Sequence, residues 1–158
     1  MALVSDVLDR LVTILEATTV DTSYDGSSAF EHIQRHSDDD LLDVQSPTRL
    51  FRLDVDGGRQ AVGPMGATVS PIYVQRTINL QVYYTLGDDA WSLEKVIAED
   101  VDRLAFQLEQ PGNWNTPTDV AVSSILVGSY SIEAGEAQAG AAMLTIPVEV
   151  IYRPSFTG

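Results

Sequence analysis

The sequence predicts an α+β fold in which a mostly antiparallel or mixed β-sheet is packed by two amphipathic helices, with a long protruding loop. Apolar residues recur at helical spacing near the start of the chain and again after residue 90. Two other segments, 74–84 and 141–153, alternate apolar and polar side chains at the period of a strand. Helices and strands with one apolar side each are expected to bury those sides against one another.

The chain has 158 residues, which fits a single domain spanning 1–158. It has no cysteine, so disulfides, thiolate nucleophiles and zinc-cysteine clusters are excluded. The formal net charge is −14, from 23 acidic and 9 basic residues, which argues against DNA or RNA binding through counterion release. The acidity is equally compatible with a role in solubility alone.

The first 19 residues do not resemble a signal peptide, because Asp6, Asp9 and Arg10 interrupt the apolar residues. No apolar run approaches the roughly 20 residues that a membrane-spanning helix needs. We therefore expect a soluble protein without a membrane partner.

The first half of the chain contains one clear helix and one clear strand. The helix is expected over 5–18, with Leu8, Leu11, Ile14 and Leu15 on its apolar face. An irregular acidic segment, about 19–47, follows and contains a possible short element at 29–34. A half-buried strand over 50–55 is then expected to end in an Asp-Gly turn, with a partner strand starting at Arg59. An extended loop is placed at about 56–72.

The second half is more regular. The strand 74–84 runs almost directly into a helix over 90–109, and "PG" at 111 and 112 stops that helix. Strands are expected from 120 to 133 and from 141 to 153, before a flexible C-terminal tail, 154–158. Pro147 cannot donate to a β-ladder, so the last strand is predicted to lie at an edge or to carry a bulge there. The expected apolar side chains are Val74, Ile78, Leu80, Val82 and Tyr84 on the strand and Leu93, Val96, Ile97, Leu104 and Leu108 on the helix.

Motifs for catalysis or metal binding are weak. His32 and His36 would share one face of a helix, but the glutamate of "EHIQRH" precedes the first histidine, so a histidine-containing loop is favoured over a metal site. "DVDGG" at 54–58 lacks the remaining ligands of a calcium loop and is interpreted as a hairpin turn. No phosphate-binding loop or nucleophile motif is present. We expect no enzyme activity, cofactor or metal.

Two side chains break the pattern of the second helix. Asp100 falls on the apolar side, where a carboxylate needs a partner, and Arg76 on the apolar face of the strand is the predicted cation of a buried pair. Phe106 falls on the charged side. A single exposed aromatic is common, and the alternative is a protein interface.

The order of elements resembles the tail-terminator proteins of long-tailed phages. The features that carry the resemblance are an amphipathic N-terminal helix, a polar stretch, the strand "RTINLQVYY" leading into an acidic-capped helix, and a closing strand ending in "VEVIYR". The resemblance implies a structural protein that forms a hexameric ring, caps the tail tube and joins it to the head connector. It implies location in the virion tail or neck after assembly in the host cytoplasm, without an active site.

The partners implied are other copies of the chain, the tail-tube protein and head-tail connector proteins, with DNA passing through the lumen without specific binding. Six subunits would carry a formal charge of about −84, which would repel DNA from the wall of the channel. Candidate lumen residues are Asp38, Asp39 and Asp40. Interface candidates, chosen on physical grounds, are Pro64, Met65, Val69, Phe106 and Phe156.

Three other interpretations of the sequence are considered. A head-tail connector or head-completion protein of the neck would also be a small α+β subunit of a ring. A monomeric adaptor would be acidic for solubility only. An enzyme would require a pocket containing carboxylates, and Asp100 is the one carboxylate to inspect.

Overall fold

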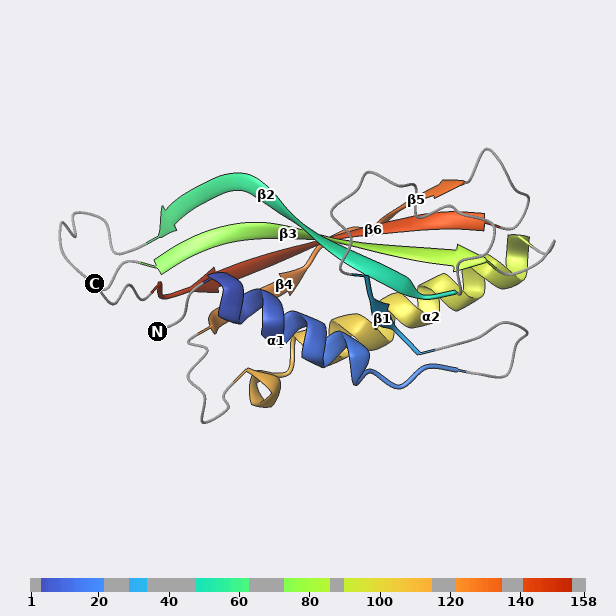
Figure 1. Cartoon of the computed structure of the whole chain (residues 1–158), viewed down its shortest axis with the longest axis horizontal. Helices are drawn as coiled ribbons and strands as arrows, with labels where there is room; N and C mark the ends of the chain where they lie inside the picture. Colours follow the sequence, from blue (N-terminus) through green and yellow to red (C-terminus); the bar gives the residue numbers. More distant parts are fainter. Residues whose placement is uncertain are drawn as a thin grey trace.

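The chain folds into a curled, mixed β-sheet of six strands with two helices on one of its faces, as the computed structural model in Figure 1 shows. The structure describes residues 4–21, 29–33, 48–62, 73–85, 90–114, 122–134 and 141–154. The α+β prediction is confirmed. The elements are α1 (Val4–Glu16), β1 (Glu31–His32), β2 (Leu50–Val62), β3 (Tyr73–Thr85), α2 (Ala90–Leu108), the 3₁₀ turn η1 (Pro111–Asn113), β4 (Val122–Val127), β5 (Ser131–Ala134) and β6 (Ala141–Tyr152).

Two long antiparallel strands, β3 and β6, form the centre of the sheet. The order is β1-β2-β3-β6-β4, and β5 pairs with β6 as a second short partner beside β4. β1 is parallel to β2, and the other pairs are antiparallel. β3 and β6 stay in register from Val74 opposite Tyr152 to Thr85 opposite Ala141. This continuous ladder is the frame on which the shorter elements lie.

The core lies between one face of this ladder and the two helices. The alternation predicted for β3 is confirmed, because Val74, Ile78, Leu80, Val82 and Tyr84 are all buried. Their β6 partners on the same face are buried too, among them Leu144, Ile146 and Val148. The opposite face carries polar, half-buried residues in the middle of β3, namely Gln75, Thr77, Asn79 and Gln81.

Both helices place one stripe on the inner face of the sheet. α1 buries Val7, Leu11, Ile14 and Leu15, whereas Leu8, expected in this set, is half-buried. α2 buries Leu93, Ile97, Val101, Leu104 and Leu108, and Val96 is half-buried. The two helices also contact each other, and Arg10 Nε on α1 donates to the carbonyl of Asn113 at 2.6 Å. The helices and η1 therefore form one layer.

The hairpin predicted at the Asp-Gly sequence is wrong. β2 continues through 56–58 as one 13-residue strand and pairs with β3 along its length. Between Val55, opposite Ile78, and Arg59, opposite Arg76, β2 advances four residues while β3 advances two. The extra residues form a β-bulge, in which the amide of Gly58 donates to Asp56 Oδ1 at 3.1 Å. The turn-forming residues 56–58 are therefore accommodated as a bulge within β2, because the long strand β3 continues beside them.

The prediction that Pro147 marks an edge strand is also wrong, since β6 lies between β3 and the pair β4 and β5. Pro147 occupies the point where the outer neighbour changes: β4 pairs with β6 as far as Val148, and β5 pairs from Thr145. A residue without an N–H fits this gap between ladders. The amide of Gly128, just after β4, donates to the Pro147 carbonyl at 2.8 Å.

Gly128→Ala is expected to destabilise the fold by about 1–3 kcal/mol, because the added methyl group overpacks a tight contact. A Cβ at Gly128 would lie 2.9 Å from Pro147 Cγ and 3.3 Å from its carbonyl oxygen. The measurement is the free energy of unfolding in urea. Gly112→Ala is the matched control, because its Cβ would meet nothing within 4 Å. Equal stabilities of the two variants would contradict this packing.

Candidate functional site

A buried charged cluster joins α2 to the sheet. Asp100, on the inner side of α2, is only 1% exposed and Arg49, just before β2, is 0% exposed. Arg49 Nε donates to Asp100 Oδ2 at 2.7 Å and Nη2 donates to Oδ1 at 3.0 Å, a bidentate pair. The hydroxyl of Tyr84 on β3 donates to Asp100 Oδ2 at 2.8 Å. Both carboxylate oxygens are therefore occupied.

Asp100 has a cationic partner, as predicted, but the prediction that this partner is Arg76 is wrong. Arg76 lies further along β3, half-buried, and its Nε donates to the hydroxyl of Tyr152 at 3.2 Å. Arg49 takes the place beside Asp100 because it adopts a left-handed backbone conformation, with φ of 66°. Its amide is held by the Tyr83 carbonyl at 2.7 Å.

The same arginine reaches the segments around α1 and β1. Its Nη1 donates to the carbonyl of Asp21 at 3.3 Å, and its guanidinium carbon lies 5.7 Å from the centre of the Phe30 ring. The carbonyl of Arg49 accepts from the amide of Glu31 at 3.2 Å. A fully buried group with every side occupied offers no place for a substrate, so we assign this cluster to the architecture.

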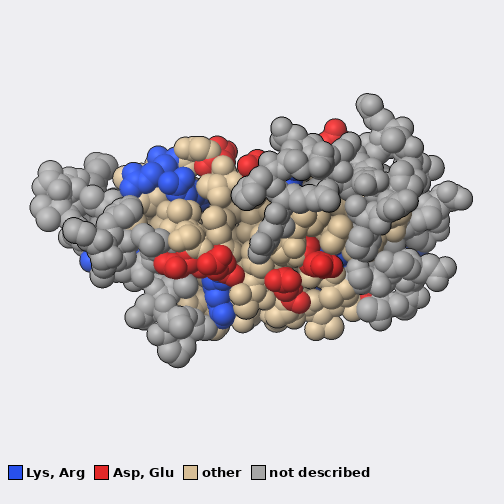
Figure 2. All heavy atoms as spheres, viewed as in Figure 1, with Lys and Arg blue, Asp and Glu red and all other residues tan. Residues whose placement is uncertain are grey.

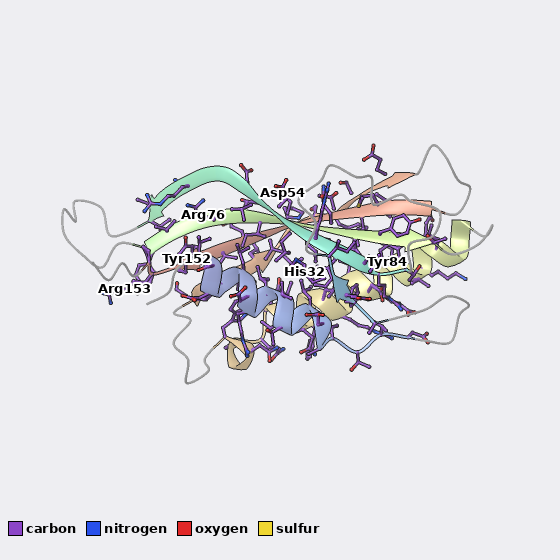
Figure 3. All side chains as sticks on the ribbon, viewed as in Figure 1. His32, Asp54, Arg76, Tyr84, Tyr152 and Arg153 are labelled. Atoms are coloured by element: carbon purple, nitrogen blue, oxygen red, sulfur yellow. The ribbon has the colours of Figure 1, made fainter. Side chains whose placement is uncertain are left out.

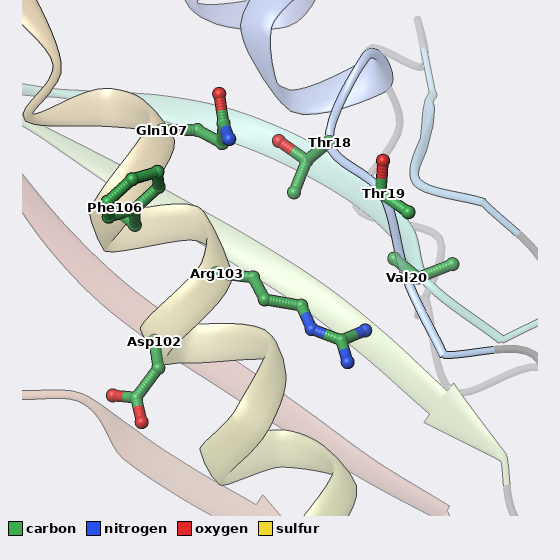
Figure 4. Close-up of a pocket in the computed structure, with 7 residues that line it drawn as sticks. All are labelled: Thr18, Thr19, Val20, Asp102, Arg103, Phe106 and Gln107. Carbon is green, nitrogen blue, oxygen red and sulfur yellow. The ribbon is translucent and has the colours of Figure 1, made fainter.

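Phe106 is exposed, as its position on the charged side of α2 predicted; 62% of its surface is open to solvent. It lines a surface hollow of about 450 Å³ between α2 and the residues that follow α1. Figure 4 shows Thr18, Thr19 and Val20 across from Asp102, Arg103, Phe106 and Gln107 on the helix. Arg103 faces Glu99 at 3.9 Å, a weak exposed pair. The hollow thus presents an aromatic ring with charged groups at its rim.

A second group of exposed apolar side chains lies along the β4–β5 edge of the sheet, where Ile132 is on the helix side and Leu126 is on the opposite side. Leu126 on β4 is 56% exposed, Tyr130 between β4 and β5 is 41% exposed, and Ile132 on β5 is 43% exposed. By register, Leu126 pairs with Glu149, which points away from the helices. β4 and β5 have no further strand beyond them among the described residues. Unpaired edges with apolar side chains favour association with another chain.

An arginine pair lies at the far end of β2 and β3. Arg59 and Arg76 are opposite each other in register, on the helix side of the sheet. Figure 3 labels Arg76, Tyr152 and Arg153 at this end, and Figure 2 shows blue side chains gathered over the end of β2. Within the described ranges, neither Arg59 nor Arg76 has a carboxylate at ion-pair distance. Like charges directly opposite each other on two strands are destabilising, so this pair is expected to lower the stability of the subunit.

The remaining sequence-based candidates fall into two groups. Pro64, Met65, Val69, Phe156, Asp38, Asp39 and Asp40 lie outside the described residues. His32 is on strand β1 rather than a helix, and its ring lies 5.3 Å from that of Phe51, while His36 is outside the described ranges. In the part of the chain that is described, no group of three His, Asp or Glu side chains is placed to hold a metal ion.

Neither described helix combines the length and apolar character needed to cross a membrane. The sequence matches no model of a known protein family and no curated protein. The candidate sites therefore depend on the geometry of this chain alone.

Asp100→Asn is expected to lower the free energy of unfolding by about 3–5 kcal/mol, because it leaves the Arg49 guanidinium buried without its counter-charge. The measurement is urea unfolding followed by circular dichroism. The matched control is Glu99→Gln, the same chemical change at the next residue, where the pair with Arg103 is exposed and its loss costs at most about 1 kcal/mol. A stable Asp100→Asn protein would overturn the architectural assignment and make Asp100 a candidate for chemistry.

Proposed function

We propose that this chain is a tail-terminator protein of a long-tailed phage, a structural subunit that forms a hexameric ring, caps the tail tube and joins it to the head connector. In this proposal the protein is not an enzyme. It acts in the tail or neck of the virion, and DNA passes through the ring without specific binding. The sequence resemblance in the order of elements is the origin of the proposal.

The observation that carries the proposal is the pair of different exposed apolar surfaces on one small subunit. Phe106 projects from the helix layer, whereas Leu126 projects from the opposite face of the sheet. A ring with cyclic symmetry is built from heterologous contacts, in which two different surfaces of each subunit meet. A further surface is needed for the tube, and the free β4–β5 edge, which carries Leu126, is a candidate for it, whereas Phe106 is a candidate for the contact between subunits.

The rigid part of the subunit also suits a structural role. The β3–β6 ladder extends over twelve residue pairs, and α2 is fixed to it by its apolar stripe and the Arg49–Asp100 pair. A head-side connector of the neck would have the same requirements, and it is the second candidate. A monomeric adaptor is less favoured, because it would need a separate partner protein for each of the exposed apolar surfaces.

The purified chain, imaged by negative-stain electron microscopy with isolated tail tubes of its phage, is expected to form annular particles seated on tube ends. The physical reason is that a tube end offers the repeated contacts that align six subunits. Tubes from an unrelated phage serve as the control and are expected to stay bare. Copurification with portal protein rather than tube protein would favour the head-side connector.

Sedimentation of the chain over a range of concentrations completes this test. A species that stays monomeric at every concentration, with tube ends present, would overturn the ring proposal.

A further inference from the structure

We infer that the arginine pair of one subunit, Arg59 and Arg76, binds the Phe106–Asp102 hollow of a second copy of the chain. The inference deepens the ring proposal and rests on it, because it names the surfaces through which neighbouring subunits meet.

Charge is unevenly distributed within the subunit, although Asp54 and Asp56 are also exposed on β2, before Arg59. The exposed charged residues of the helix layer are mostly acidic, namely Asp6, Asp9, Glu16, Glu94, Glu99, Asp102 and Glu109. Figure 2 shows red side chains over the region of α1, and further red side chains beside the blue group at the end of β2. In a chain with a net charge of −14, two copies repel unless a basic surface of one meets an acidic surface of the other. The end of β2 and β3 provides that basic surface.

Arg59 and Arg76 lower the stability of the subunit in these positions. Arg59 is exposed and Arg76 is half-buried, and they face each other across antiparallel strands. The only bond of Arg76 to a described side chain is the one to the Tyr152 hydroxyl. A carboxylate or aromatic ring from outside would relieve the repulsion between the two guanidinium groups. A surface selected for subunit stability alone would avoid this arrangement.

The hollow has the groups that a guanidinium binds. Phe106 presents an open aromatic face, and Asp102 lies one helical turn before it with no hydrogen bond or ion pair to any other described residue. Arginine stacks on aromatic rings and pairs with carboxylates at the same time. Arg103 also lines the hollow, but Glu99 lies beside it. The net chemistry of the rim favours an incoming cation.

The contact is heterologous, because the arginine pair and the hollow are different surfaces on each copy. Each contact uses the arginine pair of one subunit and the hollow of the next, so an open chain of subunits keeps one free surface of each kind at its ends. A ring closes when the free hollow at one end receives the free arginine pair at the other. Polyanions are the competing occupant of an arginine pair, but the overall charge of −14 opposes their approach.

The test is sedimentation velocity at roughly 50 and 500 mM salt on the wild-type chain and on charge variants. Arg59→Glu and Asp102→Arg are each expected to weaken self-association about tenfold or more. Combining Arg59→Glu with Asp102→Arg in one chain is expected to restore it. Arg52→Glu is the matched control for the first variant, because Arg52 lies on the same strand but faces the opposite side, toward Gln81.

A second measurement separates assembly from folding. The monomer of Arg59→Glu is expected to melt about 1–4 °C higher than wild type, because glutamate opposite Arg76 replaces a like-charge pair with an attractive one. Weaker association in a more stable subunit is a combination that a purely architectural role of Arg59 does not produce. A lower melting temperature would contradict the proposed repulsion.

Other outcomes show whether only the proposed contact is wrong or the ring proposal is wrong as well. If Arg59→Glu forms the same rings as wild type, these surfaces are not the contact, while the ring proposal stands. If wild type is monomeric under all conditions, both fail. If wild type binds a short DNA duplex in fluorescence anisotropy, and Arg59→Glu loses DNA binding but not self-association, the arginine pair is a polyanion site and the inference is wrong.

Discussion

The placement of α2 on the sheet depends on one buried ion pair, because Asp100 on α2 and Arg49 before β2 belong to parts of the chain that no hydrogen-bond ladder joins. Asp100 belongs to α2, Tyr84 to the end of β3 and Arg49 to the entrance of β2. Through Asp21 and Phe30 the same arginine also contacts the residues that follow α1 and the residues that precede β1. Buried charges of this kind stabilise little compared with apolar packing, but they tolerate few alternative arrangements. The pair therefore defines how the helix layer is placed on the sheet.

Sequence reasoning succeeded where a pattern repeats over many residues. The β3 alternation and the α2 stripe extend over three or more periods, so single exceptions do not obscure them. It failed where a single residue or a distant partner decides. Nothing in "PTRLF" reveals that Arg49 adopts a positive φ, and the strand position of Arg76 made it the more obvious partner for Asp100. β1, with two residues, is too short for any periodic signal.

The errors at the Asp-Gly sequence and at Pro147 have a common cause. Both predictions applied a local rule to a strand whose neighbours were unknown. Turn residues become a bulge when a long partner strand continues beside them, and a proline is acceptable inside a sheet when the ladder changes partner at that residue. The exposed residues behaved differently: Phe106 was found from its position alone, whereas the β4–β5 surface was missed because its strands do not alternate cleanly.

The bulge in β2 determines which face of the sheet each later residue of the strand occupies. Because β2 gains an even number of residues on β3 there, Arg59 keeps the same side of the sheet as Val55. Loss or gain of one residue within 56–58 would invert every position from 59 to 62 and turn Arg59 to the other face; loss would place Gln60 opposite Arg76, and gain would place the residue before Arg59 there. Length variation at this site is therefore compatible with the arginine pair only in steps of two, although the residues themselves are exposed and free to change in type.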